Sequence, residues 1–331
     1  LLEPASKERA AMVESIKKGI NKLGLLKMSE TSKVRRNYLN YLVKEVVHLD
    51  LELNPEHIKN YVLRVAEIAR TSEEKAAPTT QGYESLRRIA GKLYCQIGDL
   101  SAKIKDASGV GKNREWQRGY YDSAARLGNG KAYYKLGLIY ADNKTFNVDF
   151  QKSQEAFGEA ADKDYIPACY HLGEQYETEG DKEVSMAWHE RAAQGGFPAS
   201  QYKLYQAYIN NDINISQEVA LQYLEQAALV GHEVAQYTLA KHYWENANYK
   251  SAVAWFKQAA YQGILESYAF LGLAAAKGLA QPQDAQAALD CYLRAEKAGK
   301  ENAVARYGRA RLYEQGAEGV KQDLGIALTL Y

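Results

Sequence analysis

Small and apolar residues recur along the chain in the pattern of a helical repeat. The word A-A-x-x-G-x-x-x-(A/S)-x-x-x-L-G returns six times with different letters between its fixed positions. In each copy, the small residue and the residues four and eight places later fall on one face of a helix. The pattern therefore predicts six helices that begin at Ala132, Ala168, Ser200, Ala235, Ser267 and Ala303.

The spacing of these starts predicts helix-turn-helix units. The starts are separated by about 32 to 36 residues, and the tail of another helix precedes each of them. A glycine ends most of these tails, at the place where a left-handed helix cap is favoured. The capping positions are Gly128, Asp164, Gly196, Gly231, Gly263 and Gly299.

Small and bulky residues alternate between the two helices of a unit. The residue after the leucine of each first helix is small in most copies, whereas Tyr205 interrupts this pattern. Each second helix carries an aromatic or bulky pair that begins four places before the tail, and we expect the pair to fill the wider gaps between helices. The small residues are Gly137, Gly173, Ala240, Gly272 and Gly308, and the bulky ones are Phe157, His189, Leu224, Phe256 and Tyr292.

The words AYYKLGLIY, ACYHLGEQY and YGRARLYEQGAEGVKQDLGIALTLY, the last with its G-x-x-G-V-x-x-D, resemble the Sel-one-like repeat, a subclass of the tetratricopeptide superfamily. The resemblance extends over roughly residues 117–331. Together with the period, it predicts an all-α fold: a right-handed superhelical α-solenoid of helix-turn-helix repeats with an N-terminal helical region.

The repeat words divide the chain. Residues 1–80 lack them but show apolar spacing of three and four, which predicts an N-terminal helical domain or cap. AAPTTQGY, at residues 76–83, is the expected boundary, and residues 83–331 form the solenoid with a divergent first unit. The last unit stops where the others place their bulky pair, so we expect this chain to be part of a longer one.

Charge and composition narrow the choice of partner. The formal net charge is +1, from 42 basic and 41 acidic residues, which disfavours nucleic acid as the main partner. No apolar run approaches the length of about 20 residues that a membrane span needs. The three cysteines show neither a metal-type spacing nor the even count of a disulfide framework.

Sequence motifs for catalysis are absent. The chain contains no G-x-G-x-x-G, P-loop, H-E-x-x-H or nucleophile-elbow motif. No two of the six histidines stand four residues apart, which favours core or surface histidines over a metal site. The sequence therefore predicts a protein that is not an enzyme and needs no cofactor or metal.

Tyrosine is abundant, with 26 copies against 6 of phenylalanine. Tyr134, Tyr170, Tyr202 and Tyr237 recur two residues after successive helix starts. Repeat packing with the hydroxyl group near water is the first interpretation, and we favour it. An aromatic ladder along a ligand groove is the second.

The variable positions of the first helices indicate a binding surface. Positions three, six and ten after each start lie opposite the core and would line the inner, concave face of a superhelix. A solvated face explains the polar triplets, such as Lys203, Gln206 and Asn210, without any partner. Apolar and aromatic groups beside cations suit peptide capture. We name the following predicted partner-binding residues the inner stripe: Lys135, His171, Lys203, Lys241, Phe270, Leu273, Lys277, Arg306, Arg309 and Tyr313.

These features predict a non-catalytic scaffold or adaptor for a protein or peptide partner. The family resemblance implies multiprotein assembly and, for bacterial members, frequent export to the periplasm or beyond, with roles in virulence. It leaves open a regulator of a cell-wall enzyme, acting as inhibitor or activator, or an exported factor that binds a host protein. An enzyme with its active site outside these residues is a third alternative.

Overall fold

The computed structural model describes residues 88, 91, 92, 94, 95, 98, 99, 110–142, 149–297 and 302–331. Within them, every regular element is an α-helix, and one isolated β-bridge joins Ala317 to Val320. The chain forms two compact units, of which the first ends at Tyr165 and the second begins at Ile166. The helices and the boundary that the sequence predicts for residues 1–83 lie outside the described residues.

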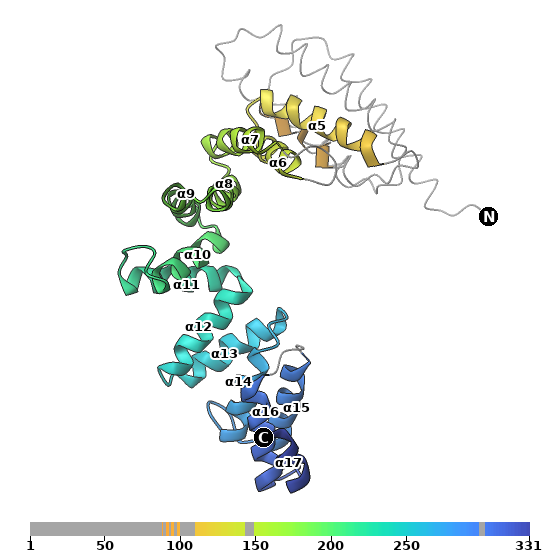
Figure 1. The fold of residues 1–331 in the computed structure, drawn as a ribbon, viewed down its shortest axis with the longest axis vertical. Helices are drawn as coiled ribbons and strands as arrows, with labels where there is room; N and C mark the ends of the chain where they lie inside the picture. Colours follow the sequence, from red (N-terminus) through yellow and green to blue (C-terminus); the bar gives the residue numbers. More distant parts are fainter. Residues whose placement is uncertain are drawn as a thin grey trace, which may run out of the picture. The chain divides into compact units, whose positions relative to one another are not determined.

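The helices follow one another with short connections (Figure 1). Those described in the first unit are α5 (Val110–Arg126), α6 (Gly130–Ala141) and α7 (Phe150–Asp162). Those of the second unit are α8 (Ile166–Glu179), α9 (Lys182–Gln194), α10 (Pro198–Ile209), α11 (Gln217–Val230), α12 (Glu233–Glu245), α13 (Tyr249–Tyr261), α14 (Ser267–Lys277), α15 (Ala285–Glu296), α16 (Ala303–Gln315) and α17 (Leu324–Leu330).

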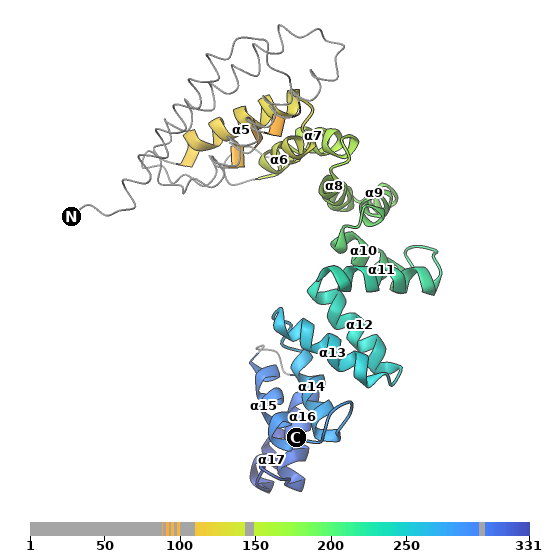
Figure 2. The same ribbon diagram turned by 180° about the vertical axis from the view of Figure 1, so that it is seen from behind.

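Each helix packs on its neighbours in sequence. In the first unit α6 lies between α5 and α7, and in the second unit every consecutive pair from α8 to α17 is in contact. α14 also packs directly on α16, and the view from behind shows the same arrangement (Figure 2). Since helix pairs contact mainly the next pair along the chain, the prediction of an all-α repeat solenoid is confirmed.

The predicted helix caps adopt the left-handed conformation. Gly128 and Gly196 have φ of 81°, Gly231 of 102° and Gly263 of 100°, whereas Gly299 lies outside the described residues. Asp164 takes the same place with φ of 56°, which aspartate tolerates better than most residues. The tails therefore end as the sequence predicts.

The small residues at five of the predicted helix starts are fully buried. Ala132, Ala168, Ser200, Ala235 and Ser267 each have 0% of their surface exposed. The bulky residues of the second helices pack closely against the small residues that follow the leucines. A Cβ at Gly137 would lie 2.6 Å from the Phe157 ring, and one at Gly173 would lie 2.7 Å from Nε2 of His189.

α16 begins at Ala303, as the sequence predicts, but its fully buried small residue lies two positions later than in the other units. Ala303 is exposed, and Ala305 is the residue with 0% exposure. The helix cap explains the shift, because Asn302 accepts the N–H of Ala305 just as Asn129 accepts that of Ala132. In this frame Arg309, Ala310 and Tyr313 take the places of the leucine, the glycine and the tyrosine of the other units.

The recurring tyrosines pack against the next unit. Tyr170 lies 5.0 Å from Phe197 between ring centroids, and Tyr202 lies 5.0 Å from His232. Phe197 and His232 each follow the left-handed glycine that ends the preceding helix. Within the first unit, Tyr134 contacts Tyr165 at the same distance of 5.0 Å. These contacts support repeat packing as the role of the tyrosines.

Candidate functional site

The inner stripe extends over six helices, and its members differ in exposure. Lys241 and Lys277 are exposed, and the other eight are partly buried. The stripe residues are Lys135 on α6, His171 on α8, Lys203 on α10, Lys241 on α12, Phe270, Leu273 and Lys277 on α14, and Arg306, Arg309 and Tyr313 on α16.

The aromatic members of the stripe contact the core. Phe270 stacks on the buried Phe256 with ring centroids 4.6 Å apart and an interplanar angle of 7°, and its edge meets Trp244 at 5.6 Å. Tyr313 packs against the cluster around the buried Tyr292. Both side chains therefore stabilise the repeat whether or not a partner is bound.

The two arginines of the stripe are engaged within α14–α17. Arg306 donates from Nε to the carbonyl oxygen of Leu330 at 2.7 Å. Arg309 forms an ion pair with Glu296, in which the two side chains are 16% and 29% exposed. The α14 and α16 members of the stripe therefore lie on two helices that are in contact. Their aromatic and arginine side chains already contact other residues of the chain.

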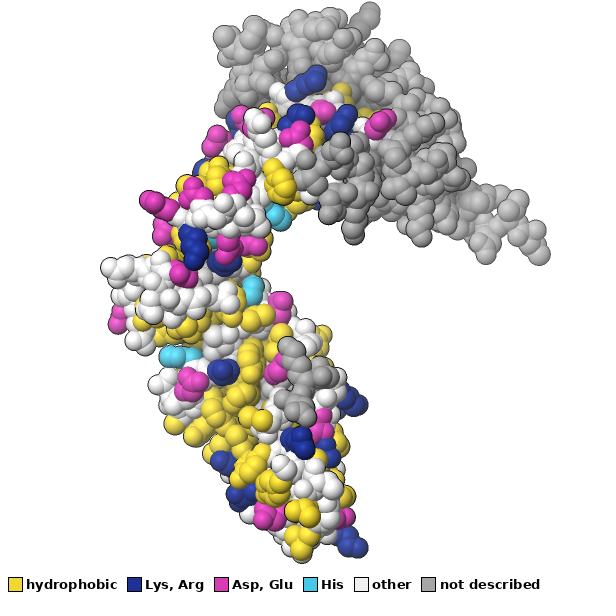
Figure 3. Space-filling view, viewed as in Figure 1, with side chains coloured by type: hydrophobic (Ala, Val, Ile, Leu, Met, Phe, Trp, Pro, Cys, Tyr) yellow, Lys and Arg dark blue, Asp and Glu magenta, His cyan; other side chains and the backbone are white. Residues whose placement is uncertain are grey.

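A hollow of about 680 Å³ lies between α9 and α10, and the inner positions of α10 line it. Lys203, Gln206 and Asn210 form one wall, while Met186 and Ile213 supply apolar surface. We call it the α9–α10 hollow. Figure 3 shows charged side chains of both signs over this part of the second unit and a broad hydrophobic area over α12 to α14.

The α9–α10 hollow has an excess of acidic groups. Glu183, Glu190 and Asp212 line it, are exposed, and form no ion pair within the described part of the chain. Lys182 is the opposing cation, since Lys203 is already paired with Glu177. The hollow therefore favours a partner that presents a positive charge.

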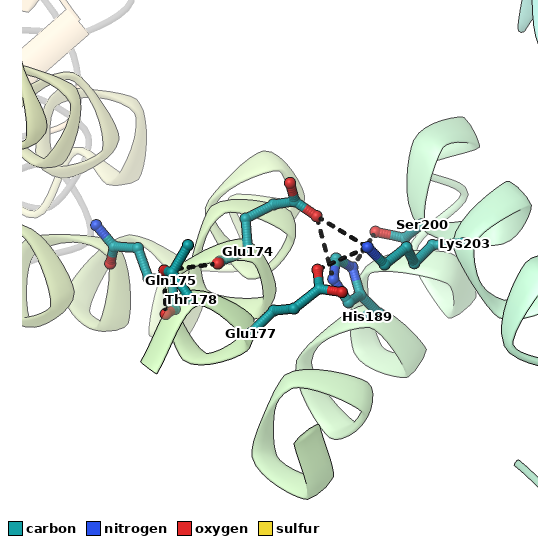
Figure 4. A network of polar contacts seen from close by, with 7 residues as sticks. All are labelled: Glu174, Gln175, Glu177, Thr178, His189, Ser200 and Lys203. Carbon is teal, nitrogen blue, oxygen red and sulfur yellow. Dashed lines mark hydrogen bonds and ion pairs between the residues drawn. The ribbon is translucent and has the colours of Figure 1, made fainter. Parts of the chain in front are cut away.

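Beside the hollow, α8, α9 and α10 bring five polar residues together (Figure 4). We call Glu174, Glu177, His189, Ser200 and Lys203 the polar cluster. Nζ of Lys203 lies 2.6 Å from Oε2 of Glu177 and 3.7 Å from Oε1 of Glu174. Burial lowers the pKa of Lys203, but the hydrogen bond to Glu177 and the two carboxylate charges outweigh it and leave the pKa raised. Lys203 is therefore a firmly held ammonium ion.

His189 is the buried member of the polar cluster. Its side chain is 0% exposed, and Nδ1 lies 3.2 Å from Oγ of Ser200. Nε2 has no hydrogen-bond partner, although Oε1 of Glu174 lies 3.5 Å away. Burial first, and then the charge of Lys203, lower the pKa of His189 to about 4, so the imidazole is neutral near pH 7.

The contact between Ser200 and His189 has the spacing of a nucleophile and its base, but not the access. Both side chains are fully buried, so a substrate has no route to the hydroxyl group. The sequence places His189 at a packing position and does not reveal the rest of the polar cluster. The one signal in the sequence is that a histidine stands where other units carry phenylalanine, leucine or tyrosine.

No helix in the described ranges is both long enough and apolar enough to span a membrane.

Comparison with known proteins identifies the repeat. The Sel1 repeat matches residues 166–197, 212–232, 234–264, 265–300 and 302–331. A protective antigen of uropathogenic Escherichia coli strains with an SLR fold has 18% identity and a TM-score of 0.58, over 98% of this chain and 76% of the antigen. A Sel1 repeat protein from Oxalobacter formigenes has 23% identity and a TM-score of 0.49, over 66% of this chain and 95% of that one. No curated protein matches the chain.

Repeat folds of this class generally mediate protein–protein interactions, because stacked units offer an extended surface. Four of the five matched repeats coincide with the pairs α8–α9, α12–α13, α14–α15 and α16–α17, and residues 212–232 contain α11 without α10. The sequence resemblance continues upstream into α6 and α7. The second unit is therefore an array of Sel1 repeats, and its fold is that of a tetratricopeptide-like solenoid.

Proposed function

We propose that this chain is a non-catalytic adaptor that binds a segment of a partner protein along its inner stripe. The observation that carries the proposal is the α9–α10 hollow, because three variable inner positions of one helix line a cavity of about 680 Å³. A hollow of this size accepts one or two side chains of a peptide. Packing alone does not require these polar residues, since they lie opposite the buried face of α10.

The hollow also suggests the chemistry of the bound segment. Glu183, Glu190 and Asp212 favour a lysine or arginine, and Met186 and Ile213 favour a neighbouring apolar side chain. Peptide recognition commonly combines an apolar anchor with charges at the rim, where the charges set register and association rate. We infer a partner segment with a basic residue next to an apolar one.

The remainder of the inner stripe provides a second contact. Lys241 and Lys277 are its exposed cations, and they lie on α12 and α14, beyond the hollow in sequence. Acidic residues in the partner would pair with them. A partner with basic and acidic segments in this order would therefore fit better than one of uniform charge.

We also propose that the protein acts outside the cytoplasm, in the periplasm or after secretion. The support is its similarity in fold to a protective antigen of uropathogenic Escherichia coli strains. In that setting the partner would be a cell-wall enzyme or a host protein, and binding itself would be the regulatory event.

The test is a selection of peptides from a displayed random library, followed by titration of the best binder against purified chain by fluorescence anisotropy. Glu190→Lys and Asp212→Lys place positive charge in the hollow, so a basic peptide should bind roughly tenfold more weakly to each. Glu318→Lys is the matched control, because Glu318 is exposed in the turn before α17.

Added salt should reduce the difference between these variants, since exposed charges are screened. Equal affinity of all four proteins for the selected peptide would exclude the α9–α10 hollow as the binding site. Selection of acidic peptides alone would contradict the inferred chemistry of the partner.

A further inference from the structure

His189 occupies a place where the repeat requires only a bulky apolar group. The equivalent residues in the other units are Phe157, Leu224, Phe256 and Tyr292, and each of them is at most 1% exposed. An imidazole in this place removes two polar nitrogens from water, which disfavours folding unless both find partners. Packing alone therefore does not explain the histidine.

Only one of these nitrogens has a partner. Nδ1 contacts Oγ of Ser200 at 3.2 Å, whereas Nε2 is buried without a hydrogen bond. Nε2 points toward the carboxylates of Glu174 and Glu177 (Figure 4). One ligand atom from each of these three side chains lies within 4.8 Å of the other two. The unpartnered nitrogen and the two carboxylates thus converge on one point.

This point already attracts a cation. The ammonium group of Lys203 lies 2.6 Å from Glu177 and 3.7 Å from Glu174. We propose that Glu174, Glu177 and His189 form a binding site for a divalent transition-metal ion, with zinc as the best fit, and that the Lys203 ammonium neutralises the carboxylates in the metal-free protein.

The donor set fits this class of ion. Zinc binds neutral imidazole and carboxylate oxygens at about 2.0 to 2.2 Å, and solvent or a partner group can complete the tetrahedron. When Nδ1–H donates to Ser200, Nε2 keeps its lone pair for the metal, and the hydrogen bond fixes the ring as it does in most metal-binding histidines. Calcium and magnesium prefer oxygen ligands alone and are expected to bind poorly.

The ligands can reach the shorter distances of a metal site. The side chains of Glu174 and Glu177 are 41% and 42% exposed, so their carboxylates are free to move inward. Lys203 is 27% exposed and lines the α9–α10 hollow, so its ammonium group can turn into the hollow when a metal ion arrives. Metal binding would thus join α8 to α9 and add a cation to the hollow.

The test measures zinc binding alone, and its outcome does not depend on any peptide partner. Isothermal titration with zinc chloride should give one site per chain in the wild type. His189→Phe, which restores the ring found at Phe157 and Phe256, should weaken zinc binding by at least tenfold and keep the helical circular dichroism spectrum. The paired exposed changes Glu174→Gln and Glu177→Gln should do the same without any change in the core.

Two further variants make the test specific. Lys203→Met removes the competing ammonium group and should tighten zinc binding, whereas Glu318→Gln, at an exposed position in the turn before α17, should leave it unchanged. Magnesium chloride in place of zinc should give no comparable heat. A wild type that binds no zinc, or a His189→Phe variant that binds it as tightly as the wild type, would overturn the proposal.

Discussion

The ring of Phe157 lies against the backbone of Gly137, so that a Cβ at Gly137 would come within 2.6 Å of Cδ1 and Cε1. His189 packs on Gly173 and Tyr292 packs on Gly272 in the same way. In these three units, the glycine after the leucine leaves the space that the ring of the following helix occupies. This relationship, repeated along the chain, sets the distance between the two helices of a unit.

The first prediction concerns this close approach. Gly137→Ala should lower the free energy of unfolding by roughly 1 to 3 kcal/mol, because the added methyl group overpacks against Phe157. Gly158→Ala in the neighbouring α7 is the control, since a Cβ at Gly158 meets no atom within 4 Å. That change should raise helix stability by up to about 1 kcal/mol. Urea unfolding followed by circular dichroism distinguishes the two, and equal shifts would contradict the packing account.

The second prediction concerns the alanines of the second helices. Ala259 is 0% exposed on α13, so Ala259→Asp introduces a charge with no partner into a contact between helices. The expected loss is several kcal/mol, and adjacent repeats should melt with it. Ala254→Asp, at an exposed position of the same helix, should change the melting temperature little. An unchanged thermal transition for Ala259→Asp would be incompatible with the solenoid core.

The third prediction concerns pH. Burial, and then the charge of Cys291, raise the pKa of Tyr292 to about 12 from an ordinary value near 10. Below pH 10 the phenol is protonated in both the folded and unfolded states. Between pH 10 and 12 only the unfolded state ionises, so the folded state should lose roughly 2 to 3 kcal/mol.

Tyr292→Phe removes this ionisation and serves as the control for the other tyrosines. Its unfolding free energy should fall less steeply than that of the wild type between pH 10 and 12. Parallel curves for the two proteins would show that Tyr292 ionises as easily in the folded state as in the unfolded chain.

The fourth prediction concerns the exposed cations of the inner stripe. Lys241→Glu and Lys277→Glu should slow association of a selected peptide with acidic residues, and the effect should weaken at high salt. Lys257→Glu and Lys297→Glu carry the same charge change at exposed positions of α13 and at the end of α15. Stopped-flow kinetics would show whether the stripe differs from these controls, and identical rates would remove Lys241 and Lys277 from the binding surface.

The helices could be predicted because their signal is local. The recurring small residue, leucine and capping glycine define the helices of a unit from residues within that unit alone. Five of the six predicted starts are fully buried residues. The sixth helix begins at the predicted Ala303, but its buried small residue is Ala305, because the cap at Asn302 lies two residues further from Gly299 than the caps of α6, α10 and α12 lie from their glycines. A connection two residues longer cannot be recognised from apolar spacing alone.

The contacts of the inner stripe could not be predicted, because they depend on how consecutive helices pack. In sequence, Phe270 is an apolar residue opposite the core arc, yet in three dimensions its ring stacks on Phe256 of α13. The polar cluster was hidden for the same reason. Glu174 and Glu177 share a helix face, but only the packing of α8 on α9 brings His189 to them.

The contacts that Tyr170 makes with Phe197 and Tyr202 makes with His232 bear on how such a chain can change in length during evolution. Each contact joins one unit to the next through the same two positions, and each second position follows a left-handed glycine. Removal of residues 197–231 would therefore place His232 directly after Gly196, where Tyr170 would meet it in place of Phe197. A whole repeat can therefore be lost or gained as a unit, because the tyrosine at each junction can pack against more than one following residue.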